Sequence, residues 1–141
     1  MNKDLIDVWI RSDYLRKRIP DSQKARSMIA SAKENMTVVK GIPLTEQSAV
    51  LIFRETYESI RQLGDASWWL QGYEPRNHEI CMDALKEMDI KEKIMLNHLN
   101  RFKKILNDVN YRGFKATVAQ AKEILALWNA CSDEIIALLI K

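Results

Sequence analysis

The chain has 141 residues, of which 47% are hydrophobic and 29% are charged, so we expect one folded domain over residues 1–141 rather than a disordered chain. Four Gly and three Pro are too few for the many turns of an all-β fold. The net charge of +3 is mild and neither requires nor excludes a nucleic-acid partner.

The N-terminal part of the chain predicts two helices. A first, extra helix spans residues 1–19 and precedes a core of residues 21–141. Asp21 and Ser22 follow Pro20 and cap the second helix. Its apolar stripe, at spacings of three and four, consists of Met28, Ala32, Met36 and Val39. The pattern stops at Gly41–Pro43.

The longest helical pattern runs from Thr45, the expected N-cap, to Gln71, and Gly72 ends it. Its apolar face is Ala49, Phe53, Thr56, Ile60, Leu63, Ser67 and Leu70. On another face, Arg54, Glu58 and Arg61 lie three and four residues apart, so we expect these side chains to pair along one edge of the helix.

The second half of the chain also reads as helices. Asn77 caps a helix over residues 78–88, and Asp89–Glu92 resembles a capping box, which predicts a kink or break there. A further helical pattern begins at Ile90 and continues up to the stop at Gly113. Thr117–Gln120 is another capping box, and it opens the last amphipathic helix.

These segments predict an all-α fold, an antiparallel bundle of four to five helices with the extra N-terminal helix. No segment alternates convincingly between apolar and polar residues. Thr37–Val39 is the one β-like run, and it is too short to build a sheet.

The sequence carries no signal for export, a membrane span or a metal site. Residues 1–5 mix charged and apolar side chains, and no apolar run approaches the roughly 18 residues of a membrane helix. We therefore expect a cytoplasmic protein with no membrane partner. Cys81 and Cys131 are isolated, so we expect two buried thiols and neither a metal nor a cofactor.

Chemistry-bearing residues are sparse. The two histidines, His78 and His98, are far apart in the sequence, and no phosphate loop or nucleophile motif occurs. Positive charge gathers in two groups, which fit either phosphate binding or a solvated surface. The groups are Arg11, Arg16, Lys17, Arg18, Lys24 and Arg26, and Arg101, Lys103, Lys104, Arg112 and Lys115.

Two stretches of the sequence carry more specific information. The first comprises Phe53–Glu58, Leu63–Ala66 and Gly72–Glu79, and the second is Ile105–Gly113, which leads into the last helix. Over residues 25–140, and in the right helix order, these stretches resemble the HEPN superfamily, in particular its small stand-alone prokaryotic members.

The resemblance implies a four- or five-helix bundle that usually forms a homodimer. Many HEPN members are metal-independent endoribonucleases, and many act as toxins paired with a nucleotidyltransferase-type antitoxin. Active members carry an Arg, then a polar residue, and a His four to six positions after the Arg. The His serves in acid–base chemistry on the ribose 2′-hydroxyl and the scissile phosphate, and the Arg stabilises the charge that develops on this phosphate.

This chain departs from the family signature at both ends. Leu106 stands at the Arg position, Asn107 and Asp108 follow it, and Tyr111 stands at the His position. A leucine cannot donate a hydrogen bond to phosphate. A tyrosine, with an ordinary pKa of about 10, transfers protons poorly near neutral pH. These departures favour a protein without ribonuclease activity.

The first hypothesis is therefore a degenerate HEPN-like homodimer that binds RNA, a nucleotide or a nucleotidyltransferase-type partner, in a toxin–antitoxin or regulatory setting. The resemblance implies a cleft near a two-fold axis. Its expected lining residues are Asn107, Asp108, Tyr111 and Arg112, with Arg54 and Glu55 as neighbours.

Two other hypotheses stay open. The chain could be an active, metal-independent endoribonuclease with a rearranged site, for which Tyr111, Arg112 and His78 are the candidates. His78 also has a purely structural interpretation, at the start of a helix. Alternatively, the chain could be a structural oligomerisation bundle whose basic residues only keep it soluble.

Overall fold

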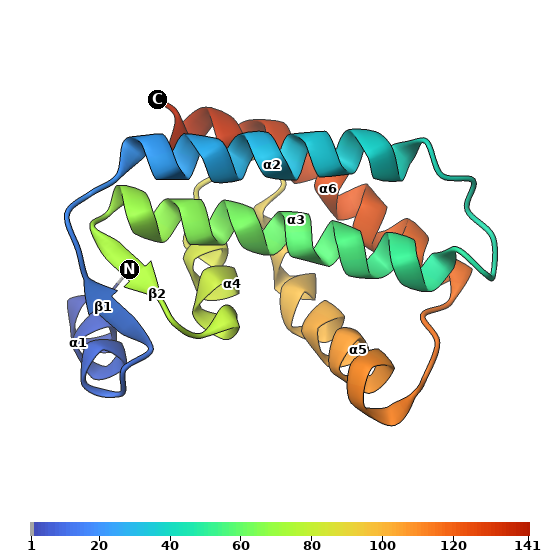
Figure 1. Cartoon of the computed structure of the whole chain (residues 1–141), viewed down its shortest axis with the longest axis horizontal. Coiled ribbons are helices and arrows are strands. Elements are labelled where there is room, and N and C mark those ends of the chain that lie inside the picture. Colours follow the sequence, from blue (N-terminus) through green and yellow to red (C-terminus); the bar gives the residue numbers. More distant parts are fainter. Residues whose placement is uncertain (1) are drawn as a thin grey trace.

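The computed structural model describes residues 2–141, which form six α-helices, one short 3-10 helix and a two-stranded sheet (Figure 1). The elements are α1 (Lys3–Arg11), β1 (Leu15–Lys17), α2 (Ser22–Lys40), α3 (Ala49–Leu70), β2 (Tyr73–Pro75), α4 (His78–Lys86), η1 (Lys93–His98), α5 (Leu99–Arg112) and α6 (Val118–Leu139). The predicted all-α class is confirmed. Met1, which belongs to the first predicted helix, lies outside the described residues.

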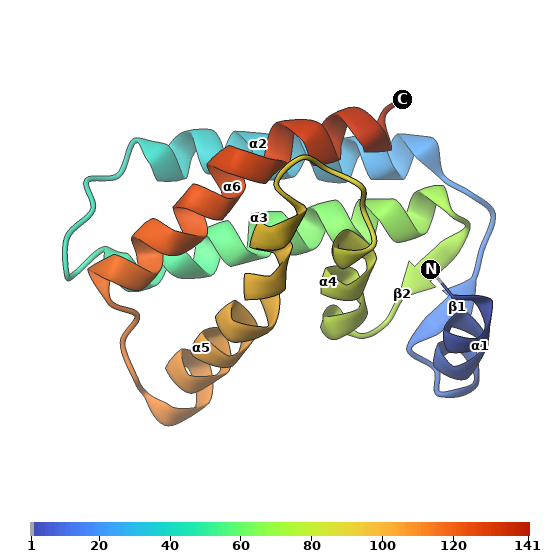
Figure 2. The same ribbon diagram turned by 180° about the vertical axis from the view of Figure 1, so that it is seen from behind.

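α3 is the central helix of the bundle, and α2, α4, α5, α6 and β2 all contact it. α2 runs antiparallel beside it, and α6 runs obliquely behind both α2 and α3 in the view of Figure 1 and in front of them in Figure 2. The apolar face predicted for α3 is buried, except that Leu70 is only partly covered. Phe53 stacks edge-to-face on Phe102 of α5, with ring centroids 5.9 Å apart. The main core therefore forms around α3.

Three predicted helix starts are confirmed by their capping hydrogen bonds. The Asp21 carboxylate accepts a hydrogen bond from the Lys24 backbone N–H at 2.9 Å, and the Asn77 side chain accepts one from the Glu79 N–H at 2.8 Å. At the start of α6, Thr117 and Gln120 form the reciprocal capping box. Local sequence is sufficient at these positions because each cap lies within three residues of its partner.

Two predicted helix starts differ in the structure. α3 begins at Ala49 rather than directly after Thr45, because the Ser48 hydroxyl accepts from the Thr45 N–H and donates to the Pro43 carbonyl, which holds residues 43–48 in a turn. The capping hydrogen bond expected of Thr45 is present, since its hydroxyl accepts from the Ser48 N–H at 3.2 Å. Residues 89–92 form no capping box. The N–H of Lys91 instead donates to the Glu134 carboxylate of α6 at 2.9 Å. The predicted break is real, because residues 87–92 lie between the end of α4 at Lys86 and the start of η1 at Lys93.

The N-terminal segment is not one helix over residues 1–19. α1 ends at Arg11, Asp13 adopts a positive φ of 61°, and β1 then pairs antiparallel with β2, with Leu15 opposite Pro75. Thr37–Val39, the β-like run, lies inside α2. The strand forms because Leu15 is buried against the aromatic cluster of Trp9 and Trp68.

α4 lies unusually close to α3. A Cβ placed on Gly64 of α3 would lie 2.0 Å from the carbonyl oxygen of Cys81 in α4, so only glycine allows this approach. α5, drawn in orange, diverges from α4 in both views (Figures 1 and 2). Of the α5 residues, only Leu99 and Phe102 are fully buried. Residues at the start of α4, on α5 and on α3 line a common hollow.

Candidate functional site

A groove of about 290 Å³ lies between the N-terminus of α4 and one face of α5, with α3 as its floor. It is lined by Tyr57 of α3, by Asn77, His78 and Glu79 at the start of α4, and by Lys103, Leu106, Asn107, Asn110 and Tyr111 of α5. The α5 residues follow the helical spacing of three and four, so one face of α5 forms a complete wall of the groove. Nearly all of these side chains are polar or aromatic.

The start of α4 is held firmly beside the groove. Asn77 caps the helix, and the indole N–H of the fully buried Trp68 donates to the Ile80 carbonyl at 2.8 Å. Ile80 and Cys81 are buried against α3 and the N-terminal aromatic cluster. Because these residues face inward, His78 and Glu79 are turned outward and remain exposed.

Two polar contacts connect the walls of the groove to each other and to α3. Nζ of Lys103 lies 2.7 Å from Oε1 of Glu79, so an ion pair joins α5 to α4 across the groove. Nη2 of Arg54 on α3 donates to Oδ1 of Asn110 at 3.2 Å. Arg54 therefore lies next to the groove without belonging to its lining.

Tyr57 is 5% exposed, and its burial raises the pKa of the phenol to about 12, so the hydroxyl is protonated at neutral pH.

On the same helix, the side-chain pairing predicted for Arg54, Glu58 and Arg61 is only partly formed. Arg61 pairs with Glu58 and with Asp65, whereas Arg54 turns away to Asn110. The hydrogen bond to Glu58 raises the pKa of Arg61, and burial raises the pKa of the Asp65 carboxyl although Arg61 opposes this shift.

Both cysteines are free and buried, as the sequence predicts. Burial raises the pKa of the Cys81 thiol to about 12 and also raises the pKa of Cys131. Because a thiolate is the reactive form of cysteine, neither side chain offers a nucleophile at neutral pH.

The structure brings together three of the residues singled out in the sequence. His78, Asn107 and Tyr111 line the same groove, although His78 is about 30 positions away from the other two. Tyr111 is 84% exposed at the open end of the groove. Arg54 joins them indirectly, through its hydrogen bond to Asn110.

The other three candidates do not line the groove. Asp108 and Arg112 form their own ion pair along α5, with Nε of Arg112 3.7 Å from Oδ1 of Asp108. The Glu55 carbonyl accepts a hydrogen bond from the Asn35 side chain of α2, so this part of α3 faces α2. Consecutive helical residues differ by about 100° in direction, which separates Glu55 from Arg54 and Arg112 from Tyr111.

The sequence reasoning missed Tyr57, Asn77, Glu79 and Asn110 as site residues, and it included Lys103 only as part of a charge group. The spacing on α5 could have indicated Lys103 and Asn110, because they share a face with Asn107 and Tyr111. Tyr57 had no such signal, since a tyrosine beside an apolar stripe is an ordinary core residue.

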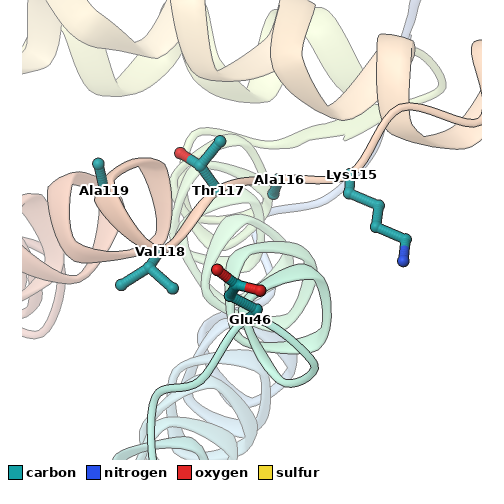
Figure 3. Close-up of a pocket in the computed structure, with 6 residues that line it drawn as sticks. All are labelled: Glu46, Lys115, Ala116, Thr117, Val118 and Ala119. Atoms are coloured by element: carbon teal, nitrogen blue, oxygen red, sulfur yellow. The ribbon is translucent and has the colours of Figure 1, made fainter.

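A second hollow, of about 410 Å³, lies where the connection between α2 and α3 meets the start of α6 (Figure 3). Glu46 and Val118 face each other across it, while the Lys115 side chain extends away. The N–H of Gln120 is already bonded to Thr117 in the capping box. The remaining lining residues are mostly small or apolar, so this hollow offers few groups that could orient a ligand.

Within residues 2–141, no group of three or more His, Cys, Asp or Glu side chains is arranged to hold a metal ion. No helix in the same residues is long and apolar enough to cross a membrane.

Fold and groove together define the class of protein: an all-α helical bundle with a polar groove between two of its helices. Comparison with protein-family models, curated proteins and solved structures finds no match to the chain. The HEPN resemblance stays a prediction.

Proposed function

We propose that the chain is a cytoplasmic, HEPN-like module without ribonuclease activity, and that it binds RNA or a nucleotide in the groove between α4 and α5. The observation that carries this proposal is the convergence of His78, Asn107 and Tyr111 on one polar groove. His78 belongs to the first of the two HEPN-like stretches, and Asn107 and Tyr111 belong to the second. Both stretches therefore contribute residues to the same groove.

The groove has the groups that single-stranded RNA requires. The exposed ring of Tyr111 offers a stacking surface for a base. The side-chain amide of Asn107 can both donate and accept hydrogen bonds at base edges or at a ribose hydroxyl. The amide oxygens of Asn77 and Asn110 already accept hydrogen bonds within the protein, so these two side chains contribute their NH₂ groups as donors. Arg54, beside the groove, supplies a positive charge for the backbone.

The same groove lacks the arginine to which the resemblance assigns stabilisation of the cleaved phosphate. Leu106 lines the groove at the position that the resemblance assigns to the catalytic Arg. The two arginines of α5 do not replace it, because Arg101 pairs with Glu123 and Arg112 pairs with Asp108, and neither lines the groove. Removing one preorganised stabiliser of a developing charge lowers the rate by about a hundred-fold or more, which supports a binding role.

The proposal includes a homodimer in a toxin–antitoxin or regulatory setting, with a nucleotidyltransferase-type protein as a possible partner. The end of α5 supports self-association, because Tyr111 and Phe114 expose 84% and 58% of their surface there. Sedimentation of the purified protein tests this part. A monomer at all concentrations would exclude the dimer.

Tyr111→Ala is expected to weaken binding of a fluorescein-labelled ten-nucleotide RNA by about ten-fold, because loss of one base–aromatic stack costs about 1–3 kcal/mol. Fluorescence anisotropy at several salt concentrations measures the dissociation constant. For the wild-type protein the affinity should fall as salt rises, since contacts to the phosphate backbone release counterions.

Tyr14→Ala is the matched control, because Tyr14 is also an exposed tyrosine, at 44%, but lies at the N-terminal strand. It should leave the affinity within two-fold of wild type. Equal losses in both variants, or no salt-sensitive binding by the wild-type protein, would contradict the proposed site.

The second candidate function is a metal-independent endoribonuclease. One observation favours it: His78 and Tyr111, two of its three candidate residues, line the same groove. Incubation of RNA with excess protein and a chelator tests it. Cleavage that disappears in His78→Ala would establish this activity, whereas intact RNA at high protein concentration would exclude it.

A further inference from the structure

We infer that Lys103 is the phosphate-binding residue of the groove, and that Glu79 competes with the phosphate for it and so decides how strongly anionic ligands bind. This inference rests on the proposed function and assigns its phosphate contact. The observation behind it is the ion pair between Lys103 and Glu79 across the groove.

The composition of the lining makes Lys103 the relevant cation. Among the described residues that line the groove, Lys103 is the one Lys or Arg and Glu79 is the one Asp or Glu. Nζ of Lys103 lies 2.7 Å from Oε1 of Glu79, which is the separation expected for an ammonium and any oxyanion. A phosphate oxygen bound to Lys103 in the groove would therefore replace the Glu79 carboxylate.

The pair is placed so that it can open. The Lys103 side chain is 33% exposed and the Glu79 side chain is 61% exposed, and ion pairs this accessible contribute little to stability. Glu79 lies on the first turn of α4 and faces solvent, so its carboxylate can swing outward while Lys103 stays over the groove. The cost of opening is small, yet a carboxylate left near the bound phosphate repels it.

The Lys103–Glu79 ion pair also affects which ligands the groove binds. A neutral ligand gains no advantage from displacing Glu79, whereas a ligand with a phosphate must displace it and then gains Lys103. Glu79 therefore restricts the groove to ligands whose other contacts, such as stacking on Tyr111, contribute enough binding energy. Glu79 acts as a specificity-determining residue.

Anisotropy with the labelled ten-nucleotide RNA tests the inference through a double-mutant cycle. Glu79→Gln should tighten binding about five-fold, and Lys103→Gln should weaken it about five-fold. In the Lys103→Gln background, Glu79→Gln should tighten binding by less than two-fold, because the residue it competes for is gone and only the screened repulsion between an exposed carboxylate and the phosphate remains. Thermal unfolding of each variant verifies that α4 stays folded, and Glu79→Ala repeats the test with another side chain.

Glu123→Gln is the matched control. Glu123 also pairs with a cation of α5, Arg101, and its side chain is 47% exposed, but neither residue lines the groove. The change in net charge is the same, so this variant should bind RNA within two-fold of wild type. If Glu79→Gln and Glu123→Gln tightened RNA binding equally, the change in net charge alone would explain the effect, and the inference would be overturned.

The remaining outcomes separate the inference from the proposed function. RNA binding by the wild-type protein with no tightening in Glu79→Gln would overturn the inference alone. An undiminished effect of Glu79→Gln in the Lys103→Gln background would do the same. Absence of RNA binding by all variants would refute the proposed function and the inference with it.

Discussion

Gly64→Ala is expected to lower the free energy of unfolding by about 3 kcal/mol or more, the upper end of the range for overpacked cores. The new Cβ would lie 2.0 Å from the Cys81 carbonyl oxygen and 2.6 Å from its carbon. Both obstacles are backbone atoms, which cannot turn aside as a flexible side chain can. α4 would have to move off α3, and a large fraction of the marginal stability of a small domain would be lost.

Urea denaturation followed by circular dichroism measures this effect, and Gly113→Ala is its control. Gly113 has a φ of +70°, but a Cβ there would meet no atom within 4 Å. Its substitution should cost only about 1 kcal/mol, the penalty of a left-handed backbone for alanine. Similar losses in the two variants would show that α3 and α4 are not in this close contact.

Trp68→Ala is expected to destabilise the protein by about 3–5 kcal/mol, because it removes a large, fully buried ring. Trp68 stacks edge-to-face on Trp9 and Tyr73, with centroids 5.8 and 5.9 Å away, and its indole N–H bonds to Ile80. The variant therefore weakens the attachment of α1, β2 and the start of α4 together.

Thermal and urea unfolding measure the loss, with Phe114→Ala as the control. Phe114 is also aromatic but is 58% exposed, so its removal should change the stability by less than about 0.5 kcal/mol. A Trp68→Ala variant as stable as Phe114→Ala would contradict the buried position of the indole. A folded but weakened variant should also bind RNA less well, since His78 and Glu79 depend on the position of α4.

The sequence predicted those parts of the fold whose interactions are local. The caps at Asp21, Asn77 and Thr117 were correct, because each side chain bonds to a backbone group two or three residues ahead. The false capping box at residues 89–92 failed for the opposite reason. The Lys91 N–H donates to Glu134, which is 43 positions away, and a local sequence pattern cannot predict so distant a partner.

The pairing of β1 with β2 likewise could not be predicted from the sequence. A three-residue strand has no measurable alternation, and its partner lies almost 60 residues later in the chain. Burial of Leu15 beside Trp68 stabilises this strand, and that contact joins residues more than 50 positions apart in the sequence.

The candidate site could be predicted in part. The HEPN resemblance directed attention to Asn107 and Tyr111, and His78 was considered separately as an alternative base. All three line one groove. The same resembling stretches also predict Asp108, Arg112 and Glu55, which do not line the groove, because adjacent helical positions point in different directions. The pairing of Lys103 with Glu79 needed the tertiary arrangement of α4 and α5.

The most direct test of the central claim, that the α4–α5 groove binds RNA, is NMR chemical-shift mapping of the isotope-labelled protein during titration with the ten-nucleotide RNA. The largest shifts are expected at Tyr57, His78, Asn107 and Tyr111, which line the groove. Shifts confined to the basic segment Arg16–Arg18 beside β1, or no shifts at millimolar RNA, would contradict it.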